Sequence, residues 1–220
     1  MGYRDFPEGQ LGPQRSVHTL ERPGVLGAAL GWAAQLVGSR ADDGDLVDAV
    51  QLHAGGLKLS REGVAATVCW GDVEEVYGDT ADVWLGALGP EPEPVRGTLR
   101  LKRHDGAVHR LPPTLSEATA LFATIIARCS RAQTQECRAA LSEGSTLTFG
   151  PVTLSASELC VREKRLPLED LAMVSTRPDH LVFARKGGDR PWASVRYEVL
   201  PHVTLLLALL PPRASAQSPR

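Results

Sequence analysis

Two groups of cations are the strongest candidates for chemistry in this sequence, because clustered positive charge suits the binding of an anion or an acidic partner. The six residues are Arg162, Lys164, Arg165, Arg185, Lys186 and Arg190. We expect Arg162 and Lys164 to lie on one strand, where residues two apart leave the same face. The second group flanks Gly187 and Gly188, whose main-chain N–H groups could join the cations around an anion. The alternative is a solvated charged face.

A second candidate is an apolar contact loop, formed by Trp84, Leu85 and Leu88. These residues adjoin the run of glycines and prolines from 86 to 94, which is typical of a solvated loop between strands. We expect Trp84 to be exposed, so that the loop presents an apolar patch to a partner. Alternatively, the loop folds back over its own unit.

Metal binding, catalysis and cofactor use find little support in the remaining residues. His104 and His109 flank one expected hairpin and, with Asp105, could form a site of two histidines and a carboxylate, although solvated hairpin residues are the simpler interpretation. The chain has no nucleophile elbow, phosphate-binding loop, zinc-protease or dinucleotide motif. We therefore expect a protein that is not an enzyme and has no cofactor and no metal.

Composition limits both the partner and the compartment. The 220 residues carry a net charge of −2, with a pI near 6.3, which argues against a nucleic-acid partner. Four cysteines without metal-ligand spacing, and a polar N-terminus without a signal-peptide core, favour a reducing cytoplasm. A predominance of Arg over Lys, with no Asn, is typical of a GC-rich coding sequence, and we expect a bacterial origin.

Residues 24–39 form an uncharged apolar segment with helical spacing of its larger side chains. The segment is short for a membrane span and contains four glycines. We expect an amphipathic helix that docks on the folded body. The alternative is a helix that lies on a membrane surface.

An internal repeat organises the rest of the chain. Residues 50–59 align without gaps on residues 152–161, and each block reads as two alternating strands with a short turn. Further hairpins are expected over 98–111 and 181–195, and each copy then closes with a helix. The expected organisation is a tail with an apolar helix (1–46), a first unit (47–130), a helical linker (131–144), a shorter second unit (145–211) and a disordered tail (212–220).

The repeat resembles the pleckstrin-homology-like (PH-like) superfold, through the strings Gly-Leu-Lys-Leu-Ser-Arg, Trp-Gly-Asp-Val-Glu-Glu-Val and Leu-Thr-Phe-Gly-Pro-Val-Thr-Leu. These strings are similar to those of an uncharacterised bacterial family with tandem PH-like units. The resemblance implies an α+β, mostly β fold: two antiparallel β-barrel or sandwich units, each closed by a C-terminal helix. It also implies binding of lipids, peptides or proteins, rather than catalysis.

Taken together, the sequence predicts a cytoplasmic binding or scaffold protein whose partner is another protein. Residues 47–143 carry a net charge of −3, and residues 144–220 carry +3. The opposite signs suggest either that the units attract one another or that the second unit faces an anionic partner. The alternative function is a peripheral membrane protein, in which the basic second unit and residues 24–39 meet an anionic lipid surface.

Overall fold

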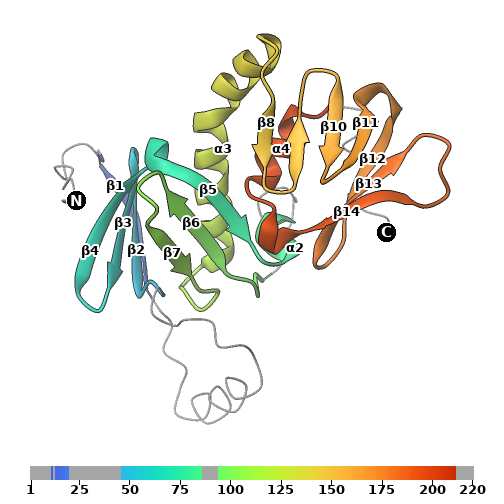
Figure 1. Cartoon of the computed structure of the whole chain (residues 1–220). Coiled ribbons are helices and arrows are strands. Elements are labelled where there is room, and N and C mark those ends of the chain that lie inside the picture. Colours follow the sequence, from blue (N-terminus) through green and yellow to red (C-terminus); the bar gives the residue numbers. More distant parts are fainter. Residues whose placement is uncertain (1–10, 12, 20–45, 86–93, 212–220) are drawn as a thin grey trace.

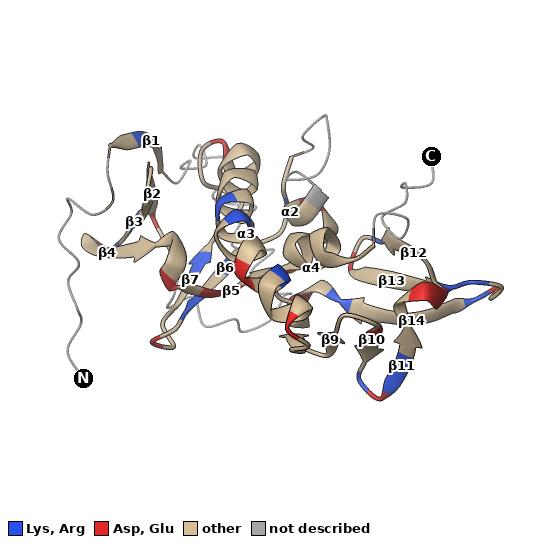
Figure 2. Ribbon diagram, turned by 90° about the horizontal axis from the view of Figure 1, so that it is seen from above, with Lys and Arg blue, Asp and Glu red and all other residues tan. Residues whose placement is uncertain are grey.

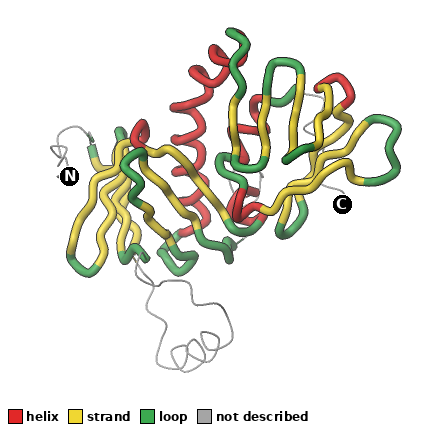
Figure 3. Tube along the Cα trace, in the orientation of Figure 1, coloured by secondary structure: helices red, strands yellow, loops and turns green. Residues whose placement is uncertain are grey.

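Four antiparallel sheets and three helices make up a mostly β structure in the part of the chain that the computed structural model describes, which is residues 11, 13–19, 46–85 and 94–211. Figure 1 shows two halves side by side, with a long helix, α3, between them. The tube in Figure 3 shows that strands dominate both halves. The expected apolar helix at 24–39, the loop from 86 to 93 and the tail from 212 to 220 lie outside the described residues.

The first half consists of a four-stranded sheet, a three-stranded sheet and two helices. The strands of the first sheet follow in order: β1 (Gln14–Thr19), β2 (Ala49–His53), β3 (Gly56–Arg61) and β4 (Val64–Cys69). The later elements are the 3-10 turn η3 (Trp70–Asp72), β5 (Val73–Gly78), α2 (Ala81–Leu85), β6 (Leu99–Arg103), β7 (Val108–Leu111) and α3 (Ala118–Ser142). Burial alternates along β2 and β6, as expected for strands with one face on a core.

The second half follows a similar order of elements without a counterpart of α2, and the strands of its four-stranded sheet and its closing helix are shorter. Its four-stranded sheet comprises β8 (Leu147–Phe149), β9 (Val152–Leu154), β10 (Glu158–Val161) and β11 (Lys164–Pro167). The later elements are the 3-10 turn η4 (Leu168–Asp170), β12 (Leu171–Thr176), β13 (His180–Arg185), β14 (Pro191–Arg196), the 3-10 turn η5 (Tyr197–Val199) and α4 (Val203–Leu209).

Equivalent hydrogen bonds accompany this shared order. The main-chain N–H of His104 donates to the Asp72 carbonyl (3.1 Å), and that of Lys186 donates to the Asp170 carbonyl (2.9 Å). Val50 pairs with Leu59 in one half and Val152 with Val161 in the other, which confirms both hairpins. Within the described ranges none of the four sheets closes into a barrel, so the barrel form of the expectation is not found.

The boundaries of the expected units need two corrections. Strand β1 lies inside the expected tail and pairs with β2, so the first sheet begins near residue 14 and not at residue 47. The closing helix of the first unit and the separate linker helix are one element, α3, of 25 residues. It begins after Glu117, a left-handed residue without a side-chain cap.

A single apolar core extends through both halves. The buried residues of α3 all lie in its first half: Ala118, Leu121, Phe122, Ile125, Ile126 and Cys129. They cover the sheets of the first half, whereas the later turns of α3 approach β8 and α4. The hydroxyls of Ser130 on α3 and Thr204 on α4 are hydrogen-bonded at 2.9 Å.

His202 forms the central joint between the halves. It precedes α4 with a left-handed backbone, and its main-chain N–H donates to the Val76 carbonyl of β5 at 2.8 Å. Its ring Nε2 lies 2.8 Å from the Glu74 carbonyl, which can only accept, so Nε2 carries the proton. Burial lowers the pKa of the His202 ring, which is 6 % exposed.

The tight approach of β3 to its neighbour gives a first prediction. A Cβ at Gly56 would lie 2.2 Å from the Val68 carbonyl oxygen and 2.8 Å from the Cys69 Cα, and neither main-chain atom can move away cheaply. We expect Gly56→Ala to lower the free energy of unfolding by about 1–3 kcal/mol in urea denaturation. Gly71→Ala is the matched control, because a Cβ there meets nothing within 4 Å. Equal stability of the two variants would contradict the packing of β3.

The His202 joint predicts a pH dependence of stability. The folded ring binds a proton less readily than the unfolded ring, whose pKa is about 6.5. The neutral His202 ring therefore makes its full contribution to the free energy of unfolding above pH 6.5. That contribution is lost as the pH falls below 6.5, by at most about 1.4 kcal/mol per pH unit. We expect the melting temperature of His202→Gln to depend less on pH between neutral and mildly acidic buffers. The exposed His104→Gln should retain the parent's dependence, and the same flattening in both variants would refute the assignment.

Candidate functional site

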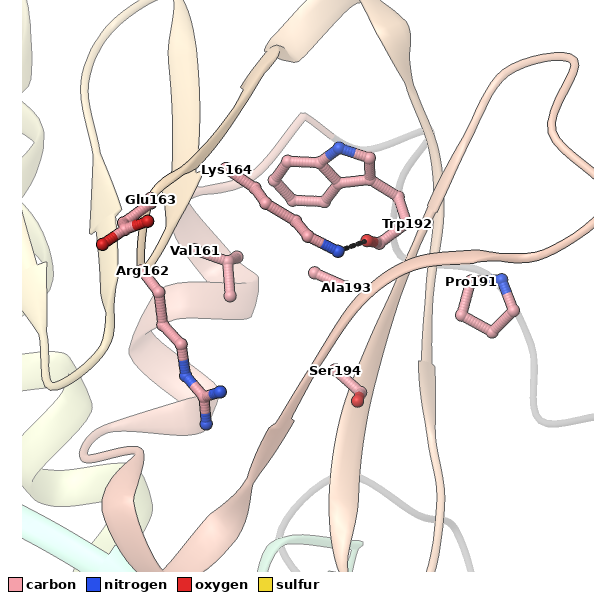
Figure 4. Close-up of a pocket in the computed structure, with 8 residues that line it drawn as sticks. All are labelled: Val161, Arg162, Glu163, Lys164, Pro191, Trp192, Ala193 and Ser194. Carbon is pink, nitrogen blue, oxygen red and sulfur yellow. Dashed lines mark hydrogen bonds between the residues drawn. The ribbon is translucent and has the colours of Figure 1, made fainter.

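A groove in the second half lies between the turn of the β10–β11 hairpin and the start of β14 (Figure 4). Its volume is about 490 Å³. The residues that line this basic groove are Val161, Arg162, Glu163, Lys164, Pro191, Trp192, Ala193 and Ser194. It therefore joins a cationic turn to an aromatic strand end.

The position of Arg162 is set by the hairpin turn. Its backbone is left-handed, with φ of 56°, which is uncommon for a residue with a side chain. Its N–H donates to the Pro151 carbonyl at 2.8 Å, and the Cys160 thiol donates to the Arg162 carbonyl at 3.1 Å. These two bonds hold the main chain of Arg162 on both sides, so that its side chain starts from a fixed point.

Lys164 and Trp192 join the two hairpins across the groove. The Lys164 ammonium donates to the Trp192 carbonyl at 3.3 Å. Figure 4 shows the stem of Lys164 running beside the half-buried indole. The lysine therefore covers an apolar surface with its methylene groups and keeps its charge at the rim.

The charges of the groove favour an anionic ligand. Two cations face one carboxylate, that of Glu163, and Ser194 adds a hydroxyl. Within the described residues the Arg162 guanidinium has no hydrogen-bond or ion-pair partner, and Figure 4 shows it directed away from the indole. An acidic group with an apolar neighbour could meet Arg162 and Trp192 together.

The structure separates the six expected cations into two classes. Arg165 lies 3.7 Å from Glu158, Arg185 lies 2.9 Å from Asp170, and the Lys186 ammonium donates to the Glu169 carbonyl. Arg190 is exposed in the β13–β14 turn. The groove therefore brings together Arg162 and Lys164 and leaves the others outside its lining.

The expected placement of Arg162 and Lys164 on one strand is wrong. Strand β10 ends at Val161 and β11 begins at Lys164, so Arg162 occupies the turn between them. The two side chains approach the groove because the hairpin reverses there, and not because of strand alternation. Trp192 is the aromatic member of this site.

The expected exposure of Trp84 is also wrong. Trp84 lies on α2, is fully buried, and its indole N–H donates to the Gly78 carbonyl at 3.4 Å. A fully buried side chain cannot serve as an exposed contact residue. Leu88 and the side chain of Leu85 lie outside the described residues.

An equivalent groove of about 450 Å³ lies in the first half, between the β3–β4 turn and β7. Its lining residues are Val47, Leu59, Ser60, Arg61, Glu62, Val64, Ala66, Ala107, Val108 and His109. The strand registers place Ala66 where the second half has Lys164, and Val108 where it has Pro191. Trp192 lies in a β-bulge between Pro191 and Ala193 that has no counterpart in the pairing of β6 with β7. The first groove thus lacks the lysine and the indole of the basic groove.

The hairpin that carries His104 and His109 does not form the metal site considered above. Asp105 instead accepts an ion pair from Arg103 at 2.9 Å and a hydrogen bond from the Ala107 N–H at 3.0 Å. Over the described ranges no three His, Cys, Asp or Glu side chains are grouped as metal ligands.

A mostly β protein with a groove in each half is the class that the fold and sites define. The chain belongs to DUF6585, a family of unknown function, whose profile matches residues 26–219. No curated protein matches the chain. Among the described helices, none has the length and apolar character needed to cross a membrane.

The left-handed backbone at Arg162 gives a prediction for the groove. Glycine adopts this conformation without the steric cost of about 1–2 kcal/mol that a side chain incurs, although it loses more conformational entropy on folding. We expect Arg162→Gly to leave the free energy of unfolding unchanged or to raise it by up to about 1 kcal/mol. Chemical denaturation measures this effect. A loss of stability would show that the side chain supports the fold.

Proposed function

We propose that this protein is a non-enzymatic binding or scaffold protein, built from two PH-like units, which recognises an acidic segment of a partner protein at the basic groove. Its site residues are Arg162, Lys164 and Trp192. The proposed location is the cytoplasm. No catalytic group, metal or cofactor takes part in this function.

The shared element order supports the proposal of two PH-like units. Each half has a four-stranded sheet, a 3-10 turn, a three-stranded sheet and a helix, in that order along the chain. The resemblance noted above implies units of antiparallel strands that are each closed by a C-terminal helix. Fold alone does not assign a function, so the proposal depends on the groove.

The observation that carries the proposal is that the Arg162 guanidinium, which has no partner among the described residues, lines the same groove as the half-buried Trp192. An arginine without a partner can form a two-pronged bond with a carboxylate, and a neighbouring indole can contact an apolar side chain. A peptide supplies both groups when an acidic residue adjoins an apolar one. Five of the residues that line the groove are exposed, namely Arg162, Glu163, Lys164, Pro191 and Ser194. An extended segment can therefore reach it.

The test is a titration with acidic peptides that contain aromatic or aliphatic residues, followed through the amide and indole NMR signals of residues 162–164 and Trp192. We expect binding that weakens as salt rises, because charge drives the contact. The double variant Arg162→Glu/Lys164→Glu should lose binding by at least about tenfold, since two attractive charge contacts become repulsive.

A control with the same change of charge is Arg96→Glu/Arg131→Glu, in which both positions are exposed and outside the groove. It should bind as the parent does. Equal losses in both double variants would assign the effect to net charge and refute the site. Absence of binding by the parent at low salt would refute recognition of acidic peptides.

A second candidate function is attachment to an anionic membrane surface. Figure 2 shows basic residues at the β13–β14 turn, which lies at the end of the second half away from the first, and at the β10–β11 turn on a neighbouring side of the same half. A surface can contact both turns, whereas a short peptide reaches only the groove. Co-sedimentation with phosphatidylserine vesicles, combined with no peptide binding, would favour this alternative.

A further inference from the structure

Strand β12 is an edge strand that nothing in the described part of the chain covers. Each of the four sheets has two edges, and an open edge exposes main-chain N–H and C=O groups that pair readily with another strand. Proteins usually protect such edges with charges, prolines or covering contacts. The edges of this structure differ in how they are protected.

The equivalent strand of the first half, β5, is covered along its free edge. Gln133 donates its side-chain amide to the Val73 carbonyl at 2.9 Å, and His202 donates to the carbonyls of Glu74 and Val76. Three other edge strands each have a carbonyl bonded from outside their own sheet: Thr67 by Arg103, Arg110 by Val47 and Trp192 by Lys164. Strand β11 carries two cations and a proline.

Strand β12 has the register of β5 but none of this cover. The pairing of β12 with β13 is shifted between Leu171 and Met173, as that of β5 with β6 is shifted between Val73 and Glu75. The carbonyls of Ala172 and Val174 therefore correspond to those that His202 caps on β5, and within the described residues they accept no hydrogen bond. The strand contains no charged residue and no proline, and Met173 is 37 % exposed.

We propose that β12 pairs with β12 of a second copy of this chain in a symmetric antiparallel dimer. Outward-facing main-chain groups alternate along an antiparallel strand, which places those of Ala172, Val174 and Thr176 on the free edge. A two-fold axis at Val174 sets Ala172 of one copy opposite Thr176 of the other. Donors and acceptors then match along the whole strand, so that the edge is complementary to itself.

The flanking charges favour the same antiparallel arrangement. Glu169 and Asp170 precede β12, and the exposed Arg177 follows it. Antiparallel pairing about Val174 brings the acidic end of each strand next to Arg177 of the other copy. A parallel arrangement would instead bring like charges together, which is unfavourable across a strand pair.

A second copy cannot cover β12 in the way that β5 is covered. Gln133 and His202, the groups that cap β5, already bond within their own chain. An assembly in which Gln133 and His202 of one copy cap β12 of the next would have to break their hydrogen bonds to β5. Self-pairing of β12 needs no such change, and it closes after two chains.

The experiment is sedimentation velocity of the full chain over a concentration series, with reductant present because the cysteines are free. We expect the parent to associate into dimers as its concentration rises. Met173→Lys places two like charges near the two-fold axis and should weaken association by about tenfold or more. Ala172→Pro removes an outward N–H without removing a bond to β13, and should have the same effect.

Val64→Lys is the matched control, because it also replaces an exposed apolar residue of an edge strand with lysine and should leave the dimer intact. Hydrogen exchange adds a direct readout, since residues 172–176 should exchange more slowly in the concentrated parent only. A parent that is monomeric at every concentration would overturn the proposal. A dimer that survives both β12 variants, or that Val64→Lys also abolishes, would overturn it equally.

Discussion

The covering of β5 by His202 is the contact on which the arrangement of the two halves depends. Strand β5 lies at the edge of its sheet, and Val76 is only 1 % exposed, so its carbonyl has little access to water. A buried carbonyl without a partner costs about 1–3 kcal/mol. The second half supplies the missing donor, and the sheet of the first half is therefore complete only when the second half is docked.

The length of α3 follows from the same arrangement. Its first turns cover the sheets of the first half with apolar residues, and its later turns extend along the second half. There Ser130 bonds to Thr204, and Arg138 donates to the Ala208 carbonyl at 3.4 Å. One continuous helix can serve two bodies only if they are held in a fixed relation, which the His202 joint provides.

The features that could be predicted from the sequence are local, whereas those that were missed depend on distant contacts. Hairpins were found because alternation and turn residues lie within a dozen positions of each other. Strand β1 was missed because it is mostly polar and its partner, β2, begins 30 positions after β1 ends. Trp84 was expected to be exposed because of the prolines after it, but its burial is decided by Gly78, where a Cβ would lie 2.9 Å from the indole nitrogen.

The basic groove illustrates which parts of a site can be located from the sequence. Residue types singled out Arg162 and Lys164, which line one groove, but the end of β10 could not be located from alternation alone. Strands β3 and β4 have six residues each, whereas β10 and β11 have four. In the second half the β10–β11 turn, which carries Arg162, lines one groove with the bulged residue Trp192, and in the first half the β3–β4 turn lines a groove with Val108. The two halves thus share one topology, and the bulge at Trp192 together with Lys164 in place of Ala66 gives only the second groove an indole and a lysine.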